Sequence, residues 1–288
     1  MICFPNAKIN IGLDIVEKRK DNFHNIETLF YPIGLADILE VNENFTPKKL
    51  KNYVENERGI SRRNSFKSTG INIPGNSKEN LCLKAYELIK KDYSVPPVKI
   101  HLHKIIPIGA GLGGGSSDAA HFIHLLENLF SLKIPVKQKL NYALQLGSDC
   151  SFFIKNKAAF AKGRGEKLES AIFSLYGFYL VLICPPIHVS TKDAYSDVKP
   201  RKPNKPLKEL LKMPVSEWKK NIFNQFEETV FKKFPGIEKI KIQLYNEGAI
   251  YSSMSGSGSS VFGLFDCLPD EKKLKKKFFD GFIWVEKL

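Results

Sequence analysis

The sequence predicts a mixed α/β protein, which we expect to divide into two domains, residues 1–160 and 161–288. Residues 7–16 alternate apolar and polar side chains around Ile9, Ile11 and Leu13, as a half-buried strand does. Residues 116–130 carry apolar side chains at helical spacing instead. A chain of 288 residues can form one large or two modest domains, and the pattern changes near residue 160.

The rest of the first half continues this mixture. Residues 42–70 are polar, rich in Lys, Arg and Asn, and without a clear period, which predicts an exposed hairpin or loop. A helix is expected over residues 80–91, with Ser77 preferred to Asn80 as its N-cap. Further strands are expected where apolar residues alternate, at residues 27–31, 36–41 and 98–103.

The second half also alternates between the two kinds of element. A Pro- and Lys-rich stretch at residues 199–208 predicts a linker or exposed turn. Helical spacing of apolar residues predicts helices at residues 136–146, 224–234 and 237–246. Apolar runs bounded by turn residues predict strands at residues 178–183, 249–254 and 261–265.

The chain is strongly basic, with 44 Lys and Arg against 30 Asp and Glu and a formal net charge of +14. A basic surface attracts polyanions such as nucleotides, nucleic acid or anionic membrane. The lysines are spread along the chain, however, which favours ordinary solvated faces. No aromatic-rich strand motif accompanies them, so a nucleic-acid-binding module is the distant alternative.

The cysteines and the apolar runs indicate the compartment. Five cysteines are far apart and odd in number, without a CxxC pair, which argues against a disulfide framework and against a zinc site. The first residues lack a basic leader followed by an apolar run, and no stretch reaches the length of a membrane span. We therefore expect a cytoplasmic protein with no membrane partner.

A glycine-rich segment is the main chemical signal. Glycine lets the backbone approach an anion at positive φ, and the first N–H groups of a following helix attract phosphate. Ser116 and Ser117 stand where hydroxyls could cap that helix or contact phosphate or its Mg²⁺. The predicted phosphate-binding residues are Pro107, Ile108, Gly109, Ala110, Gly111, Leu112, Gly113, Gly114, Gly115, Ser116 and Ser117.

Other phosphate-binding motifs fit this segment less well. The Walker pattern fails because no Lys follows the glycines, and the protein-kinase signatures are absent. Gly109, Gly111 and Gly114 satisfy the dinucleotide pattern G-x-G-x-x-G, but that pattern needs an acidic residue about 20 positions later. Glu127 is too close to serve. A purely structural glycine turn stays open as the plainer alternative.

Three segments in order resemble the motifs of the GHMP kinases, the superfamily of galactokinase, homoserine kinase and mevalonate kinase. Residues 4–13 (FPNAKINIGL) resemble the first motif, residues 107–120 the second, and residues 253–263 (SMSGSGSSVFG) the third. The resemblance extends over nearly the whole chain. It implies an N-terminal ATP-binding domain like ribosomal protein S5 domain 2, followed by a ferredoxin-like C-terminal domain.

Further segments resemble one branch of the superfamily, which phosphorylates a cytidine diphosphate derivative of a small branched alcohol in the non-mevalonate isoprenoid pathway. They are Phe23-His24 before Thr28-Leu29-Phe30, residues 146–149 and Asn224-Gln-Phe-Glu227. The resemblance implies ATP and Mg²⁺ as cofactors, a small-molecule substrate, and a monomer or weak homodimer. Another acceptor, such as homoserine or a mevalonate phosphate, is the alternative.

Lys8 and Asp149 match the catalytic pair of the family. The resemblance implies that Asp149 accepts the proton of the acceptor hydroxyl and that Lys8 keeps it ionised and favours the developing phosphate charge. By spacing alone, a surface Lys and a helix-capping Asp would explain both residues. Cys150 and Ser151 depart from the Val-Pro that commonly follows this Asp.

The same resemblance implies the substrate contacts. His24 would meet the cytosine edge and Phe23 would stack on the base, although the family usually has Tyr at the position of Phe23. Tyr195 is the candidate for the opposite face of the base, with a core helix residue as the alternative. Ser190 and Thr191 are candidates for the substrate diphosphate.

A last set of residues is expected around the reacting groups. Asn10 resembles a residue that touches the substrate hydroxyl or its phosphate, and Lys104 one beside the nucleotide. Ser255, Gly256 and Ser257 would close near the phosphates and the substrate through their backbone N–H groups, with an ordinary β-turn as the alternative. No side-chain metal site is expected, because the histidines lack companions at metal-ligand spacing.

Overall fold

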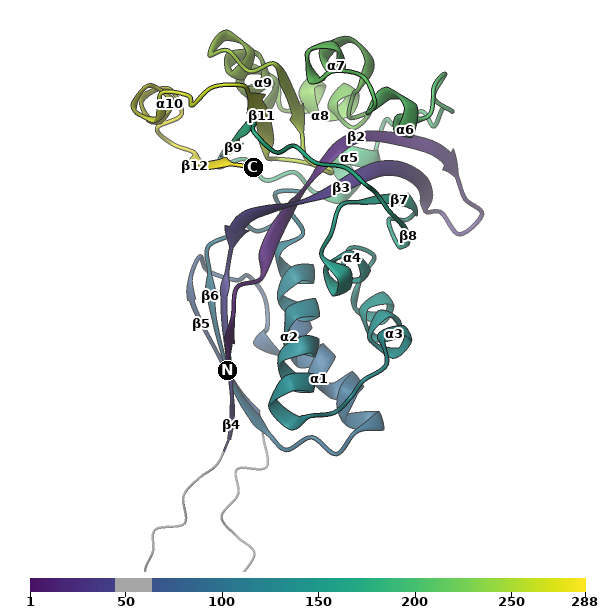
Figure 1. Cartoon of the computed structure of the whole chain (residues 1–288), viewed down its shortest axis with the longest axis vertical. Coiled ribbons are helices and arrows are strands. Elements are labelled where there is room, and N and C mark those ends of the chain that lie inside the picture. Colours follow the sequence, from purple (N-terminus) through teal and green to yellow (C-terminus); the bar gives the residue numbers. More distant parts are fainter. Residues whose placement is uncertain (45–63) are drawn as a thin grey trace, which may run out of the picture. The chain divides into compact units, whose positions relative to one another are not determined.

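A computed structural model describes residues 1–44 and 64–288 and forms two compact units (Figure 1). Unit 1 contains residues 1–5, 36–106 and 115–154, and unit 2 contains residues 6–35, 107–114 and 155–288. Each unit is built from segments that are not continuous in the sequence. The two units therefore do not correspond to a division of the chain at residue 160, and that domain boundary stays a prediction. The expected mixed α/β class is confirmed.

Unit 1 contains a four-stranded sheet in the order β1-β4-β6-β5. The inner strands β4 and β6 are antiparallel and bury Leu39, Val41, Ile100 and Leu102. Strand β5 pairs parallel to β6. It lies within residues 42–70, the stretch expected to form a hairpin or loop. Residues 45–63 of that stretch lie outside the described part of the chain. The strands are β1 (Ile2–Cys3), β4 (Ile38–Glu43), β5 (Ser65–Gly70) and β6 (Val98–Lys104).

Helices α1 and α2 lie along one face of this sheet (Figure 1). Asn80 caps α1, because its side chain accepts a hydrogen bond from the N–H of Cys82. The preference for Ser77 was wrong, since Ser77 begins a short 3₁₀ helix, η1 (Ser77–Glu79), one turn earlier. The helices of unit 1 are α1 (Leu81–Asp92), α2 (Gly114–Phe130), α3 (Val136–Leu146) and α4 (Cys150–Lys155).

Unit 2 contains two sheets, of which the first has the order β2-β3-β7-β8. Ala7, Ile9, Ile11, Leu13 and Ile15 of β2 are all buried, as the alternation in the sequence predicted. Intervening residues of the strand are buried as well, so β2 runs through the interior of the unit. The strands are β2 (Asn6–Lys18), β3 (His24–Ala36), β7 (Ala159–Gly163) and β8 (Lys167–Ser170).

The second sheet of unit 2 is antiparallel, in the order β10-β11-β9-β12. Val181 and Ile183 of β9 share one hydrophobic core with Leu13 and Ile15 of β2, which joins the two sheets. The strands are β9 (Tyr179–Cys184), β10 (Tyr251–Met254), β11 (Val261–Phe265) and β12 (Phe282–Lys287).

Short helices pack around the second sheet, and Val230, Ile237 and Leu244 from two of them complete its core. The expected linker at residues 199–208 is irregular until α6 begins at Leu207. In the described part of the chain, no helix is both long and apolar enough to cross a membrane. The helices are α5 (Thr191–Tyr195), α6 (Leu207–Leu210), α7 (Val215–Asn221), α8 (Glu227–Lys233), α9 (Pro235–Asn246) and α10 (Glu271–Lys277).

Candidate active site

Three segments that are far apart in the sequence meet around the backbone carbonyl of Gly111 in unit 2. Lys8 on β2 donates from its Nζ to this carbonyl at 3.2 Å, and Ser255 donates from its Oγ at 3.0 Å. The backbone N–H of Lys8 also donates to the carbonyl of Leu112 at 3.0 Å. The first, second and third motifs of the sequence therefore form one cluster.

The close approach at Gly111 explains why this position is glycine. Its φ is +78°, in the left-handed region that residues with a Cβ rarely adopt. A Cβ on Gly111 would lie 2.0 Å from the carbonyl oxygen of Ser255, which is far inside van der Waals contact. A side chain here would separate the glycine loop from the loop that follows β10.

The loop after β10 is fixed to both of its neighbours. The N–H of Asn10 donates to Ser255 Oγ at 3.1 Å, which joins the loop to β2. The N–H of Ser260 donates to the carbonyl of Ala110 at 3.2 Å, which joins the loop to the glycine segment. Hydrogen bonds from the backbone of β2 and to the backbone of the glycine segment therefore hold the loop in place.

Lys8 is buried at the centre of this cluster, with 2% of its surface exposed. Its Nζ also donates to Asn10 Oδ1 and lies 4.8 Å from the ring centroid of Phe30. Asn10 Nδ2 donates in turn to Thr28 Oγ1 at 3.1 Å. Packing and hydrogen bonds thus restrict the direction of the ammonium group, which a catalytic cation requires.

An aromatic group forms a second part of the site in unit 2. The rings of His24 and Tyr195 stack with centroids 4.7 Å apart and planes 20° from parallel, and Phe226 meets the edge of Tyr195. Phe23 is about half exposed, with 52% of its surface accessible, and the guanidinium of Arg164 lies 4.7 Å from its ring centroid. The structure thus brings His24 and Tyr195 together, with Phe23 next to His24 at the start of β3.

The environment of His24 favours the neutral imidazole. Burial lowers the pKa of His24, and the positive charge of Lys18 lowers it further. A neutral ring has one donor and one acceptor nitrogen, which suits the edge of a nucleobase.

Ser190 has a local structural role. Its Oγ accepts from the N–H of Asp193 at 3.0 Å and donates to the Asp193 carboxylate, so Ser190 is the N-cap of α5. This hydrogen bond and the ion pair with Lys233 hold the pKa of Asp193 below its usual range. Thr191 begins α5 and is exposed. A contact of either residue with a diphosphate stays a prediction.

The remaining part of the glycine-rich segment belongs to unit 1, in the first turn of α2. Ser116 hydrogen-bonds the thiol of Cys150, which follows Asp149 in the sequence. Burial raises the pKa of Cys150 to about 11, and the Ser116 bond opposes this shift, so the thiol is protonated at neutral pH. The start of α2 and the turn that carries Asp149 are therefore neighbours within unit 1. Lys8 belongs to unit 2, and the pairing of Lys8 with Asp149 stays a prediction.

Lys104 is buried in unit 1 between two carboxylates. Its Nζ contacts Asp37 and lies 2.8 Å from Asp118 Oδ2, and Asp37 Oδ1 also accepts from the N–H groups of Ile105 and Ile106. Burial alone would lower the pKa of Lys104, but the two carboxylates raise it. The cluster fixes the backbone just before the glycine segment. The expected place of Lys104 beside a nucleotide stays a prediction.

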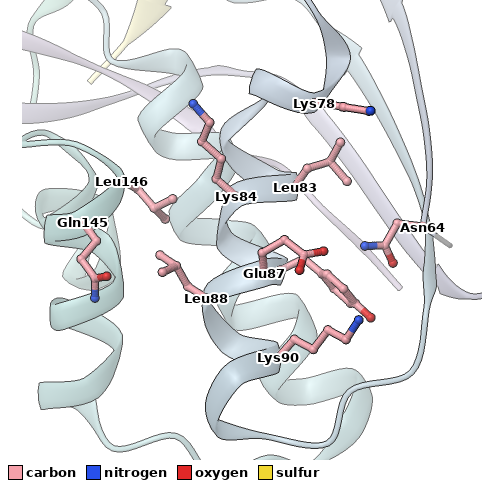
Figure 2. Close-up of a pocket in the computed structure, with 10 residues that line it drawn as sticks. Asn64, Lys78, Leu83, Lys84, Glu87, Leu88, Lys90, Gln145 and Leu146 are labelled. Atoms are coloured by element: carbon pink, nitrogen blue, oxygen red, sulfur yellow. The ribbon is translucent and has the colours of Figure 1, made fainter. Parts of the chain in front are cut away.

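A cavity of about 660 Å³ lies in unit 1, between α1 and the end of α3. Leu83, Leu88 and Leu146 form apolar parts of its wall and Lys84 and Lys90 lie at its edges (Figure 2). None of the residues predicted from the sequence to bind substrate or nucleotide lines it. The motif cluster therefore remains the candidate active site.

Sequence reasoning assigned no role to three residues of the site, although Thr28 and Asn224 stand in segments that resemble the family. Thr28 receives a hydrogen bond from Asn10 and donates to the carbonyl of Gly12, and Arg164 covers Phe23. Asn224 donates to the loop after β10. Their roles depend on contacts between distant segments, which no local pattern reveals. Within residues 1–44 and 64–288, no group of three or more His, Cys, Asp and Glu side chains could hold a metal ion.

Models of two protein domains match the sequence. The GHMP kinases N terminal domain matches residues 80–157, and the GHMP kinases C terminal model matches residues 207–281. A Bacteroides fragilis protein named 4-diphosphocytidyl-2-C-methyl-D-erythritol kinase is 48% identical over 288 residues, which cover 100% of both chains. A Parabacteroides distasonis protein of the same name is 46% identical, again over 100% of both chains.

Solved structures agree with these sequence matches. A crystal structure of 4-(cytidine 5'-diphospho)-2C-methyl-D-erythritol kinase superimposes with a TM-score of 0.79 at 29% identity, covering 99% of this chain and 98% of that chain. Homoserine kinase from Cytophaga hutchinsonii superimposes with a TM-score of 0.62 at 16% identity, over 99% of this chain and 95% of that chain. The second likeness is one of fold alone.

Proposed function

The chain belongs to the GHMP kinase family, and from that premise we propose that it transfers the terminal phosphoryl group of ATP to the 2-hydroxyl of 4-diphosphocytidyl-2-C-methyl-D-erythritol. The substrate is the one in the names of its relatives, which match it over its full length. The observation that carries the proposal is the meeting of all three motifs at the carbonyl of Gly111.

The reaction forms a bond between the substrate 2-oxygen and the terminal phosphorus. The bond from that phosphorus to the oxygen it shares with ADP breaks, and the hydroxyl proton leaves. We assign Asp149 as the acceptor of this proton and Lys8 as the cation that stabilises the charge developing on the transferred group. The hydrogen bonds of Lys8 to Asn10 and Gly111 fix the direction of its ammonium group before substrate binds.

The glycine segment and the start of α2 fit the phosphates of ATP. Gly109, Gly111 and Gly113 all have positive φ, so the loop presents its backbone rather than side chains. A Cβ on Gly115 would meet nothing within 4 Å, which leaves space for a phosphate at the first turn of α2. Mg²⁺ bound to ATP would neutralise part of the phosphate charge. Ser116 follows Gly115 and is half-buried, so its hydroxyl is the one we assign to such a complex, whereas Ser117 is buried with its Oγ 3.3 Å from His121 Nδ1.

The aromatic group of unit 2 fits the cytidine. Phe23 is about half exposed, although Arg164 lies over its ring, and the neutral His24 offers a donor and an acceptor to the cytosine edge. Tyr195 stacks on His24, so the base can bind only against this pair or by separating it. Five free thiols suit a reducing compartment, and we expect a cytoplasmic enzyme that acts alone or as a weak homodimer.

An acceptor panel tests the proposal directly. The purified protein is incubated with ATP, Mg²⁺ and one alcohol at a time: the cytidine-bearing substrate, homoserine or a mevalonate phosphate. We expect ADP release only with the cytidine compound. ADP release with homoserine or mevalonate phosphate, and none with the cytidine compound, would assign this chain to another branch of the family.

A further inference from the structure

The segment Asn224-Gln-Phe-Glu227 lies between the first and third motifs in unit 2. The N–H of Leu13 on β2 donates to the carbonyl of Phe223, and the N–H of Gln225 donates back to the carbonyl of Leu13. Leu13 and Asn224 form a parallel bridge there. The segment is therefore attached to the strand that carries Lys8 and Asn10.

The side chain of Asn224 faces the loop after β10 and donates two hydrogen bonds to it. Its Nδ2 donates to the carbonyls of Met254 at 2.7 Å and Gly256 at 2.8 Å. Its Oδ1 accepts from the N–H of Phe226 at 3.0 Å, which fixes the orientation of the amide. Only 1% of Asn224 is exposed, so water does not compete for these bonds.

Glu227 binds the residue at the start of the same loop through the preceding peptide. Its Oε1 accepts from the N–H of Met254 at 2.8 Å and from Ser253 Oγ at 3.2 Å. Its Oε2 accepts from Lys241 Nζ at 2.6 Å, which balances the buried charge. Asn224 and Glu227 thus hold both the carbonyl and the N–H of Met254, at the start of the loop.

Peptide geometry carries this constraint into the loop. A trans peptide is planar, so the direction of one carbonyl sets the opposite direction of the next N–H. By holding the carbonyl of Gly256, Asn224 aims the N–H of Ser257 away from itself. The loop residues Ser255 and Gly256 lie against Gly111 and Asn10, where phosphate is expected under the proposed function.

The N–H of Ser255 is occupied, because it donates to the carbonyl of Ser260 at 2.9 Å. We propose that Asn224 and Glu227 are positioning residues, which fix the loop so that the backbone N–H of Ser257 is aimed at the phosphoryl group during transfer. The inference rests on the proposed kinase function. It assigns to Asn224 and Glu227 a role in the rate of transfer as well as in folding. Pre-aimed N–H groups act on charge that grows in the transition state, so their misalignment reduces kcat more than it raises KM.

The test is Asn224→Asp, an isosteric change that replaces the amide donor with a carboxylate. The new oxygen would face the carbonyls of Met254 and Gly256 and repel them, which turns the peptides of the loop. We expect kcat to fall by about 10²-fold, with smaller changes in KM for ATP and for the alcohol. Initial rates are measured with each substrate varied while the other is saturating.

Gln225→Glu is the matched control, because it makes the same chemical change one residue later. Gln225 is also buried, and its amide bonds to Ile15 N–H and to the carbonyl of Lys199, away from the loop. We expect a comparable fall in melting temperature with kcat close to that of the unchanged protein. Equal losses of kcat in both variants would overturn the inference, because general destabilisation would then explain the loss in Asn224→Asp.

A milder variant decides the case if Asn224→Asp does not fold. Asn224→Ala removes the two donations to the carbonyls of Met254 and Gly256 without adding a charge that repels them. A lower kcat with little change in KM supports the inference, and an unchanged kcat overturns it. Failure of the unchanged protein to phosphorylate any alcohol is a separate result, because it refutes the kinase function itself.

Discussion

At the scale of single residues, the candidate site separates into groups that react and groups that hold them. Lys8 has its ammonium fixed by Asn10 and Gly111 within unit 2. Asp149 stands in the turn between α3 and α4 of unit 1, where the thiol of the next residue bonds Ser116. Changes at these residues are expected to alter the reaction, whereas changes at similar residues elsewhere are not.

Asp149→Asn removes the proposed proton acceptor and keeps the shape of the side chain. We expect kcat to fall by about 10²- to 10⁴-fold, with small changes in both KM values. Asp92→Asn is the control, because Asp92 lies elsewhere in unit 1, on α1, where its carboxylate accepts from Gln138 and Tyr142. A kcat equal to that of the control would remove Asp149 from the chemistry.

Phe23→Ala tests the base-binding role of the aromatic group. The ring is about half exposed, so its loss costs little stability, but stacking on a base is worth about 1–3 kcal/mol. We expect KM for the cytidine-bearing alcohol to rise by about 5- to 150-fold, with KM for ATP unchanged. Phe279→Ala, at a ring that is 84% exposed, should leave both unchanged. An equal rise in both KM values would contradict specific stacking.

The lowered pKa of His24 makes substrate binding sensitive to acid. The imidazole is neutral above this pKa and gains a proton, and loses its acceptor nitrogen, as the pH falls through it. KM for the alcohol should therefore stay constant at neutral pH and rise only below the ordinary His pKa of about 6.5. His24→Gln should remove this acid branch of the KM profile. The same acid branch in that variant would exclude His24 as its source.

At the scale of elements, the two loops of the cluster owe their shape to contacts that only backbone can make. Gly111 is pressed against Ser255, whereas Gly115 at the start of α2 faces open space. Density of glycine in the sequence predicts that such a loop exists. The same density cannot show which glycine is required by packing and which leaves room for a ligand, because this difference depends on where the loop after β10 lies.

Gly111→Ala and Gly115→Ala separate these two roles. At Gly111 the new methyl group would meet the Ser255 carbonyl and the positive φ would be strained, so we expect a loss of at least about 2 kcal/mol of stability. At Gly115 we expect an unchanged melting temperature and a higher KM for ATP. Thermal melts measure the stability of both variants, and ATP titrations measure their KM for ATP. An unchanged KM for ATP in Gly115→Ala would argue against a phosphate at that turn.

Sequence patterns predicted some elements well and others not at all. The helix at residues 136–146 was found with both ends, because its apolar period is interrupted by Pro135 and Gly147. Strand β5 was missed, because Phe66 is its only large apolar residue and its stability comes from pairing with β6. The motif residues of the site were predictable, and Asn224 was recognised as part of a family segment, but its contacts and those of Arg164 were not predictable, since distant folding partners provide them.

At the scale of the whole molecule, a buried ion cluster contributes to the stability of unit 1. Lys104 lies between Asp37 and Asp118 with almost no exposure. Burial raises the pKa of Asp118, while the ammonium favours its ionised form. The cluster therefore depends on the cation, because two carboxylates would otherwise share one dry site.

Lys104→Met tests this dependence. Loss of one partner from a buried ion pair costs about 3–5 kcal/mol, and each kcal/mol lowers the melting temperature of a chain this long by about 2–4 °C. Lys84→Met removes an exposed partner of Glu79 and should cost at most about 1 kcal/mol. Melting temperatures measured by circular dichroism check both, and equal shifts would contradict a structural role for the buried cluster.

The discontinuous make-up of the units has a consequence for synthesis of the chain. The hairpin β2–β3 leaves the ribosome early, but β7 and the Asn224–Glu227 segment, to which it bonds, are translated more than a hundred residues later. During elongation, the apolar side chains of this hairpin lack their final packing partners. Apolar surface that stays exposed in this way makes nascent chains prone to aggregation. A truncated gene ending at residue 160 should consequently yield insoluble product, whereas the full-length gene gives folded protein.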